Sequence, residues 1–397
     1  MGRVWWFCLF TMVCLRGAQA ADALSFWDRP QRGANSFNEL PPDAAYFRAL
    51  RAYDATWVRL SFSKWKSARE GDFLFGSLDD YRALVPEDLA TLRQVLDDAA
   101  GAGLRVVLVP LELPGSRWVQ LNHGQFDDRL WSDRRYWDQA AAFWRDLARA
   151  LDQHPAIAAY NLVNEPVPER RGGLDEHAAP ETMQAWYRLA RGTARDLPSF
   201  HEKLVAAVRE IDRNTPLMLD AGFYAAADAW SYWPAGLSDP RILYAYHMYE
   251  PWSATSAPNM KRAVPYRYPG VAPFGVGEAR WDARAVAGYL QQPVDWARRH
   301  GIPHNRLVAA EFGCMRRWPD CAQYLDDVLT ALEDDGVHWA FYSFREAWDG
   351  MDYELGTAKL PWQYWEAVEH GRPYELKRGP NELFEPILKR LRAGALR

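Results

Sequence analysis

Two glutamates that each end an apolar segment have the residue type and setting for acid–base chemistry. Residues 158–166 read AAYNLVNEP, so Glu165 follows a strand-like run that Pro166 prevents from continuing. Glu311 ends the apolar run 307–311 in the same way. In a parallel barrel, side chains at the carboxyl ends of strands lie on the face that carries the active site. Two carboxyl groups on that face favour hydrolysis of a glycosidic bond.

Eight strand-like runs alternate with helical patterns along the chain, which predicts a single (β/α)8 TIM barrel of the α/β class. The expected strands span 33–36, 56–62, 105–110, 156–164, 216–220, 241–247, 306–311 and 337–344. The expected helices span 41–53, 86–102, 135–153, 198–213, 282–300, 321–335 and 383–396. The longest connections follow strands, at 63–85, 111–134, 167–197, 248–281 and 345–382. Extended loops are therefore expected on the catalytic face.

The first twenty residues have the pattern of a cleaved signal peptide. Arg3 precedes the apolar run 4–15, and the AQA sequence at 18–20 has the small residues that signal peptidase requires, so cleavage is expected after Ala20. A membrane anchor fits less well, because this run is too short to span a bilayer comfortably. We therefore expect a secreted or periplasmic protein.

Residues 21–397 are expected to form one domain, since they contain no internal repeat, low-complexity tract or flexible linker. Loss of Arg3 and Arg16 with the leader changes the formal charge from −5 to −7. A mildly acidic chain without basic runs is not expected to bind nucleic acid. We expect a monomer that does not associate with membranes once the leader is removed.

Only Cys314 and Cys321 remain after leader removal. In an oxidising compartment they are expected to form a disulfide. A metal site is the weaker alternative, because no histidine accompanies them. The 20 tryptophans and 19 tyrosines exceed what a core needs, and many lie in polar stretches. Flat aromatic faces there suit sugar rings, although simple packing is the other interpretation.

Three further polar residues lie at strand ends near the glutamates. Arg59 ends the second expected strand and Tyr249 follows the sixth, so both could hydrogen-bond an ionised nucleophile, while His247 could face the acid. The alternatives are a structural ion pair for Arg59 and a buried core position for His247. Retention at the anomeric carbon requires the two carboxyl groups to differ in protonation, so their surroundings must differ.

Six segments in this order resemble glycoside hydrolase family 5, the cellulase-type retaining glycosidases. They are RGAN at 32–35, VRL at 58–60, LPGS at 113–116, LVNEP at 162–166, AYHMY at 245–249 and AEFG at 310–313. The resemblance implies that Glu165 is the acid/base and Glu311 the nucleophile. It also implies that Asn164 donates to the sugar 2-hydroxyl, with Arg59, His247 and Tyr249 as supporting polar residues.

The sequence departs from that family pattern in two places. After the third strand, Leu111 stands where many members carry a histidine, which puts the usual cellulase specificity in doubt. The eighth strand lacks the usual terminal tryptophan, so Tyr342 or Phe344 is expected to take its place beneath the sugar. Trp348 could fold over the cleft or pack in the core.

The sequence thus predicts a retaining hydrolase of a β-glucan or related oligosaccharide, resembling an endo-β-1,4-glucanase and needing no metal or organic cofactor. A β-mannanase or an exo-acting β-glucosidase is the alternative within the class. Residues 248–281 could close one end of the cleft or form a packed surface loop. A carbohydrate-binding barrel without catalysis is less consistent with the presence of both glutamates and their polar neighbours.

Overall fold

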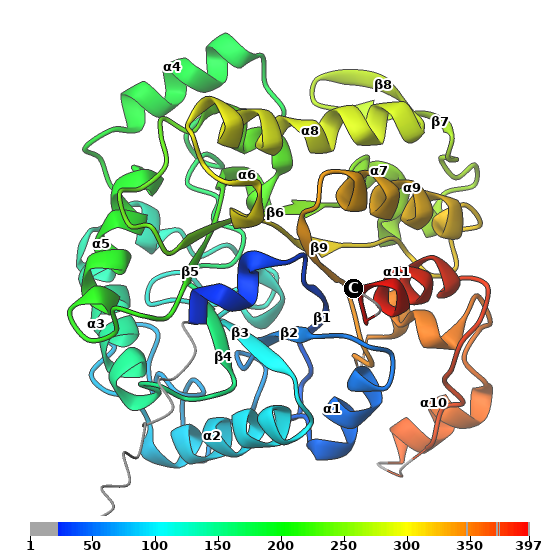
Figure 1. Cartoon of the computed structure of the whole chain (residues 1–397), viewed down its shortest axis with the longest axis horizontal. Helices are drawn as coiled ribbons and strands as arrows, with labels where there is room; N and C mark the ends of the chain where they lie inside the picture. Colours follow the sequence, from blue (N-terminus) through cyan, green and yellow to red (C-terminus); the bar gives the residue numbers. More distant parts are fainter. Residues whose placement is uncertain (1–22, 347, 371, 373, 396–397) are drawn as a thin grey trace, which may run out of the picture.

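A closed barrel of eight parallel strands forms the centre of the protein, in a computed structural model that describes residues 23–346, 348–370, 372 and 374–395 (Figure 1). Neighbouring strands follow the order β1, β2, β3, β4, β5, β6, β9, β10, and β10 closes against β1. This confirms the predicted (β/α)8 fold. The strands are β1 (Arg32–Ser36), β2 (Trp57–Ser61), β3 (Arg105–Val109), β4 (Ile157–Asn161), β5 (Leu217–Asp220), β6 (Ile242–Met248), β9 (Leu307–Phe312) and β10 (His338–Phe341).

The longer helices surround the barrel and cover the outer side of its strands (Figure 1). The helices are α1 (Ala44–Arg51), α2 (Pro86–Gly101), α3 (Arg135–Ala150), α4 (Pro180–Ala190), α5 (Leu197–Arg209), α6 (Gly222–Ala225), α7 (Trp252–Thr255), α8 (Ala283–Arg299), α9 (Cys321–Asp334), α10 (Trp362–Glu369) and α11 (Glu385–Ala395). Each of the seven predicted helices has a counterpart here. The long connections also contain elements that were not predicted: α4, α10 and the antiparallel hairpin of β7 (Gly270–Phe274) and β8 (Gly277–Trp281).

The predicted leader, residues 1–20, lies outside the described residues. Among the helices that the structure describes, none is long and apolar enough to cross a membrane.

The amino-terminal end of the barrel, opposite the site of the two glutamates, is closed by an aromatic side chain that precedes β1 in the chain. The barrel interior is lined largely by small side chains such as Ala158 and Ala340, which leave room at its base. Trp27, in a 3₁₀ turn at Ala23–Asp28, fills that space; it is fully buried and donates its ring N–H to the Ala158 carbonyl at 3.1 Å. This turn crosses the end of the barrel that faces the viewer in Figure 1. The opposite end is left for the site.

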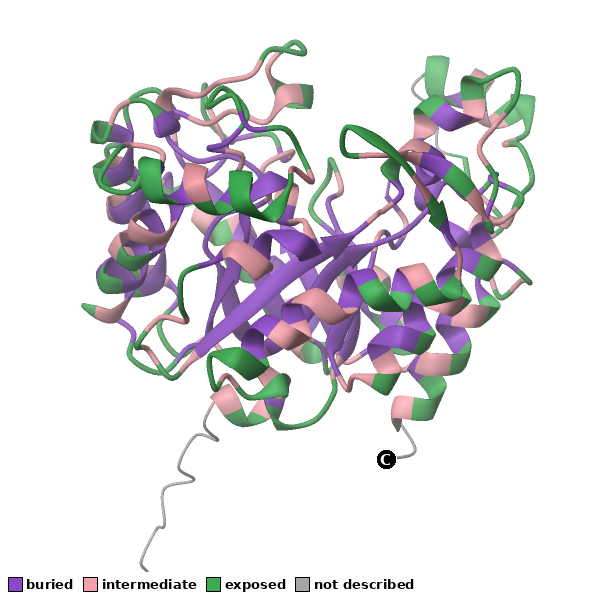
Figure 2. Cartoon of the chain, turned by 90° about the horizontal axis from the view of Figure 1, so that it is seen from above, coloured by how far each residue is buried: buried purple, intermediate pink, exposed green. Residues whose placement is uncertain are grey.

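Two barrel strands each contain one extra residue. The pairing of β3 with β4 skips Ala158, and the pairing of β6 with β9 skips Ala310. Side chains alternate along a strand, so each bulge reverses the alternation for the residues that follow. In β9, Val308 and Ala310 face the barrel interior, and the bulge turns Glu311 inward as well. The barrel strands are almost entirely buried, and the exposed residues lie on the helices and loops around them (Figure 2).

Candidate active site

Glu165, Glu311 and His247 meet at the carboxyl end of the barrel. One carboxylate oxygen of each glutamate and one ring nitrogen of the histidine all lie within 4.8 Å of one another. Retaining glycosidases place their two carboxyl groups about 5–5.5 Å apart, whereas inverting enzymes need about 6.5–9.5 Å to admit a water. The spacing of this pair fits the retaining geometry.

Arg59 lies beneath the pair and contacts side chains from several strands. It is fully buried on β2 and donates to Glu311 Oε1 at 2.5 Å. Its remaining N–H groups donate to Asn161 Oδ1 and Asn164 Oδ1, both at 2.8 Å. A buried guanidinium is tolerated only when its charge is paired and its donors are satisfied, and this arrangement does both.

Both oxygens of Glu311 accept a hydrogen bond. Arg59 donates to one, and the Tyr249 hydroxyl donates to the other at 2.8 Å. Burial raises the pKa of Glu311, and the nearby Glu165 adds to this, while His247, the Arg59 charge and the Tyr249 hydrogen bond act to lower it. The net shift is upward, and the contacts with Arg59 and Tyr249 limit it by stabilising the ionised form.

Glu165 follows β4 in a turn rather than on the strand itself. The strand ends at Asn161, so the predicted strand through residue 164 is three residues too long. The chain bends at residues 164–165, where Glu165 adopts φ 46°, outside the strand region. Its backbone N–H donates to Asp220 Oδ2 at 3.1 Å, which helps to hold this unfavourable conformation. Burial, opposed by Arg59 and reinforced by Asp220, raises the pKa of Glu165 to about 8.

His247 joins the two glutamates. Its Nδ1 lies 2.8 Å from Glu165 Oε1, and its Nε2 lies 3.8 Å from both Glu311 Oε1 and Asp220 Oδ2. Burial lowers the pKa of His247, so the neutral imidazole is favoured at pH 7. The Nδ1 atom of a neutral ring can accept a hydrogen bond from the protonated Glu165 carboxyl group. His247 is thus buried but lies within the polar site and not in the apolar core.

Asp220, which ends β5, was not predicted as a site residue. This fully buried carboxylate accepts from Asn161 Nδ2 at 2.9 Å and from the Glu165 backbone, and it lies 3.5 Å from Arg59. The signal was present, since Asp220 ends an apolar run as the two glutamates do. Asn35 on β1 was also missed as a site residue; it accepts from Arg59 and donates to the Ala310 carbonyl at 2.8 Å.

Comparison with known proteins decides the family. A model of the cellulase domain, glycosyl hydrolase family 5, matches residues 25–347. The chain belongs to glycosyl hydrolase family 5. This confirms the resemblance on which the roles of the two glutamates were predicted, and it places the protein among the glycoside hydrolases.

Solved structures of family 5 enzymes share the fold. The endoglucanase Cel5A of Pseudomonas stutzeri, in complex with cellobiose, is 19% identical, with a TM-score of 0.61 over 91% of this chain and 92% of that chain. Cel5A of Thermotoga maritima is 15% identical, with a TM-score of 0.61 over 92% and 99%. A curated relative, the beta-xylosidase of Phanerodontia chrysosporium, is 26% identical over 223 residues. That match covers 54% of this chain and 38% of the relative's length.

The residues that depart from the family 5 pattern form an apolar wall beside Arg59. Leu111 packs with Phe37 and Val109, and Tyr342 packs against the same cluster. The Phe37 ring lies over the Arg59 guanidinium at 5.4 Å and contacts the Tyr342 ring edge-on at 5.5 Å. Burial raises the pKa of Tyr342, and the charges of Glu346 and of both site glutamates add to this effect, which places its hydroxyl among these acids.

The other predicted substrate residues are placed differently. The amide oxygen of Asn164 accepts a hydrogen bond from Arg59. Its Nδ2 donates to no other side chain or backbone atom of the described residues, so it can donate to a ligand. Phe344 is buried and contacts the Tyr46 ring of α1 edge-on at 5.2 Å. Trp348 is exposed, so core packing is excluded for its side chain. The roles of Asn164, Tyr342 and Trp348 towards a sugar remain predictions.

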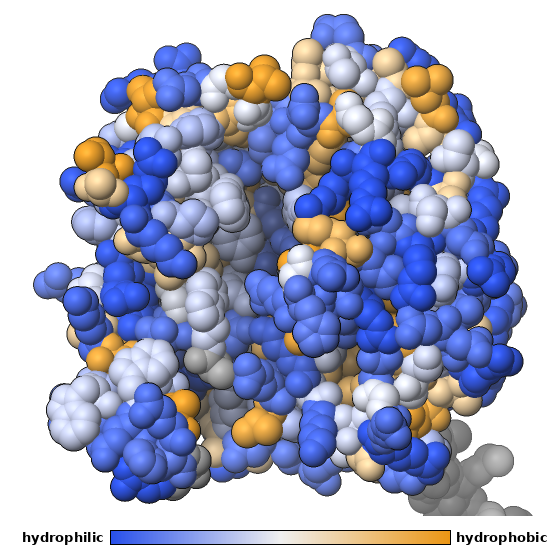
Figure 3. Space-filling model, turned by 180° about the vertical axis from the view of Figure 1, so that it is seen from behind, coloured by the Kyte–Doolittle hydropathy of each residue, from blue (hydrophilic) through white to orange (hydrophobic). Residues whose placement is uncertain are grey.

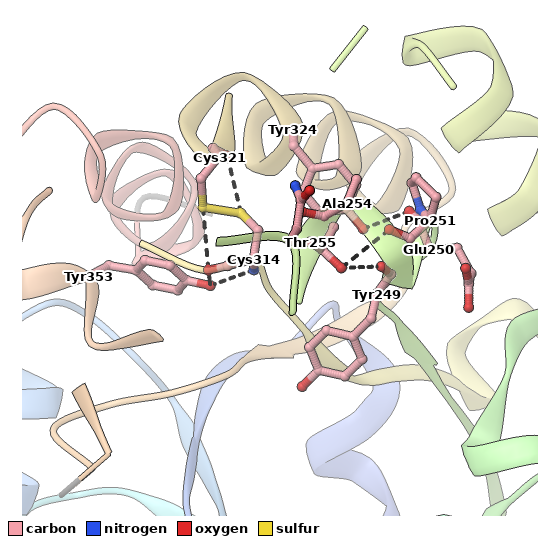
Figure 4. Close-up of a disulfide and its surroundings, with 10 residues drawn as sticks. Tyr249, Glu250, Pro251, Ala254, Thr255, Cys314, Cys321, Tyr324 and Tyr353 are labelled. Carbon is pink, nitrogen blue, oxygen red and sulfur yellow. Dashed lines mark hydrogen bonds between the residues drawn. A yellow bond between two sulfur atoms is a disulfide. The ribbon is translucent and has the colours of Figure 1, made fainter. Parts of the chain in front are cut away.

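The predicted disulfide between Cys314 and Cys321 is present, with the Tyr353 hydroxyl beside Cys314 (Figure 4). It joins the end of β9 to the first residue of α9. The next residue, Met315, donates its backbone N–H to the Thr255 carbonyl at 2.8 Å, and the Thr255 hydroxyl donates to the Tyr249 carbonyl at 2.6 Å. The cross-linked loop therefore supports the backbone of Tyr249, whose hydroxyl donates to Glu311.

The Glu165, His247 and Glu311 cluster has donor atoms close enough to one another to bind a metal ion. The Arg59 guanidinium already contacts Glu311 and lies among the other acceptors. A second cation at this point would be repelled by that fixed charge. The surroundings therefore favour acid–base use of the carboxyl groups.

We predict that Arg59→Met lowers the free energy of unfolding by about 3 kcal/mol at pH 7, because it leaves the buried Glu311 carboxylate without its counter-charge. The loss should be smaller at pH 4.5. Without Arg59 the pKa of Glu311 rises further, so at low pH the carboxyl is protonated and needs no partner. Denaturant unfolding at both pH values measures the difference. Arg59→Lys, which keeps the charge, should lose less, and an equal loss for Arg59→Met at both pH values would contradict this account.

Proposed function

We propose that the protein hydrolyses β-glycosidic bonds with retention, acting within chains of a β-glucan or related oligosaccharide. The observation that carries the proposal is the meeting of Glu165 and Glu311 at retaining distance, with different neighbours around each carboxyl group. The chemistry needs one carboxyl group protonated and the other ionised. Glu165, with its pKa raised to about 8, suits the first role, and Glu311, bonded by Arg59 and Tyr249, suits the second.

In the proposed reaction, Glu311 attacks the anomeric carbon while Glu165 protonates the leaving oxygen. Glu165 then takes a proton from the water that hydrolyses the glycosyl-enzyme. His247, against Glu165 Oε1, keeps the acid oriented. The free Nδ2 of Asn164 is positioned to donate to a sugar hydroxyl, since its oxygen is bonded to Arg59. In this scheme Glu165 carries out both proton transfers, and Asn164 binds a sugar hydroxyl.

Structural relatives support a glucan-type substrate. Solved structures with this fold include Cel5A of Pseudomonas stutzeri with cellobiose and Cel5A of Thermotoga maritima with cellobiose or with mannotriose as substrate. A mannan therefore remains an alternative substrate. We also propose that the protein is exported after cleavage at Ala20, and the Cys314–Cys321 disulfide supports an oxidising compartment.

Removal of each glutamate should have a different consequence that identifies its role. Glu311→Gly should lose nearly all turnover, and added azide should then yield a glycosyl azide of inverted configuration, because azide attacks from the side the nucleophile occupied. Glu165→Ala should lose about 100- to 10,000-fold on substrates with poor leaving groups, and azide should give product of retained configuration. Proton NMR of the products distinguishes the two outcomes.

The matched control for these variants is Glu169→Gln. Glu169 is a fully buried glutamate in the same connection as Glu165, but it contacts Tyr187 and the Phe223 backbone, away from the pair. The folded control should retain activity. Near-normal turnover by either Glu165→Ala or Glu311→Gly would rule out the scheme.

The raised pKa of Glu165 predicts an alkaline limit to activity. A general acid must be protonated, so kcat/KM for a β-glucan oligosaccharide should fall as the pH rises through about 8. A dinitrophenyl β-cellobioside, whose leaving group needs no proton, should lack this fall in its glycosylation step. Initial rates of both substrates between pH 5 and 10 provide the comparison. The same alkaline limit with both substrates would assign it to another group.

An exo-acting enzyme is the second candidate. The connection after β6 contains the β7–β8 hairpin, and a fixed hairpin on the catalytic face could close one end of the cleft, so that only chain ends enter. His177 fixes that hairpin by stacking on Phe274 at 4.2 Å while its ring bonds Asp228 and Glu250. The beta-xylosidase relative is in line with this alternative. Early products of soluble β-glucan digestion separate the two. We expect a mixture of oligosaccharides from internal cuts, and release of one small sugar alone would favour exo action.

A further inference from the structure

The connection from β10 to α11 contains a helix that the family match does not include. The cellulase model ends at residue 347, and α10 (Trp362–Glu369) lies beyond it. The base of this segment is firmly attached: buried Arg316 donates to the carbonyls of Gly356 and Ala358, and Arg378 donates to Asp352 at 2.8 Å. The helix is therefore held in place by specific contacts on either side of it.

α10 presents aromatic side chains to solvent. Trp362 is 68% exposed and Trp365 51% exposed, and their spacing of three residues puts them on one side of the helix. Tyr364 contacts Trp365 edge-on at 5.0 Å and Tyr374 at 5.9 Å, so Trp365 belongs to a small aromatic cluster, and Trp362 lies one helical turn before it. Large apolar side chains exposed together in this way can mark an interaction site.

All of the exposed tryptophans in the described part of the chain lie on one side of the barrel. Trp252 follows β6, and Trp348, Trp362 and Trp365 follow β10, so each belongs to a connection at the carboxyl ends of strands. Figure 3 looks on to that side and shows a hollow that runs from its centre towards the lower left, beside the corner where α10 projects. The aromatic patch thus borders the same face as the two glutamates.

We propose that Trp362 and Trp365 form an auxiliary binding platform for a distant part of the β-glucan chain whose other part occupies the active site. Exposed indole rings offer flat apolar faces that can stack on the C–H faces of sugar rings. The sequence of α10, WQYWEAVE, contains two glutamates and no basic residue, which does not suit an anionic lipid surface. A patch of two rings on an eight-residue helix is also small beside the roughly 800 Å² per partner of a stable protein interface.

The proposal rests on the proposed function, and its test separates the two. Trp362→Ala/Trp365→Ala is compared with Gln363→Ala, an exposed control on the same helix, each in the full chain. In a Glu165→Gln background, which prevents digestion, binding to amorphous cellulose should weaken at least about fivefold for the double variant and not for the control. In the active background, kcat/KM on soluble β-glucan should fall by a similar factor, while turnover of an aryl β-cellobioside stays unchanged.

Equal binding of cellulose by the parent and the double variant, including binding by neither, would overturn the platform. So would loss, in the double variant alone, of a dimer that the parent forms in sedimentation experiments, because the patch would then be an interface between copies. Failure of the parent enzyme to turn over any aryl β-glycoside would instead count against the proposed function, whatever the binding result.

Discussion

The buried charge of Arg59 is the constraint on which the catalytic end of the barrel depends. Its guanidinium contacts side chains that come from β1, β4, β5 and β9, as well as Asn164 in the turn after β4. Because an unpaired buried cation is strongly unfavourable, these acceptors cannot move apart without a large energetic cost. One side chain therefore couples the integrity of the barrel to the position of both glutamates.

The two glutamates differ because their surroundings do, although burial acts on both. Glu311 has a cation and a phenol hydroxyl, whereas Glu165 has a neutral imidazole and a backbone bonded to the Asp220 carboxylate. The turn after β4 positions the contacts of Glu165. The loop closed by the Cys314–Cys321 disulfide helps to position Tyr249, and so the contacts of Glu311, through Thr255. The different surroundings that the proposed retaining reaction needs are thus present before a substrate binds.

Much of this arrangement could be predicted from the sequence, because apolar runs that end in polar residues mark barrel strands and their catalytic ends. All eight strands and the disulfide were predicted, although the fourth and eighth strands end three residues earlier than expected, at Asn161 and Phe341. Asp220 was missed despite the same signal, since a lone acid at a strand end is common and only its contacts show that it fixes Glu165. The elements α4, α10 and β7–β8 were missed because they are short and half exposed, so they lack the long apolar periodicity that reveals buried elements.

The bulges at Ala158 and Ala310 put two consecutive residues of one strand on the barrel interior. Ala158 and Ala159 both lie in the interior cluster, and Ala310 is followed by the inward-facing Glu311. A regular strand would direct only one residue of each pair inward. The extra inward residue is a buried alanine in both strands. A larger side chain at either position would need volume in an interior that is already close-packed, so these two positions are restricted in size as well as in polarity.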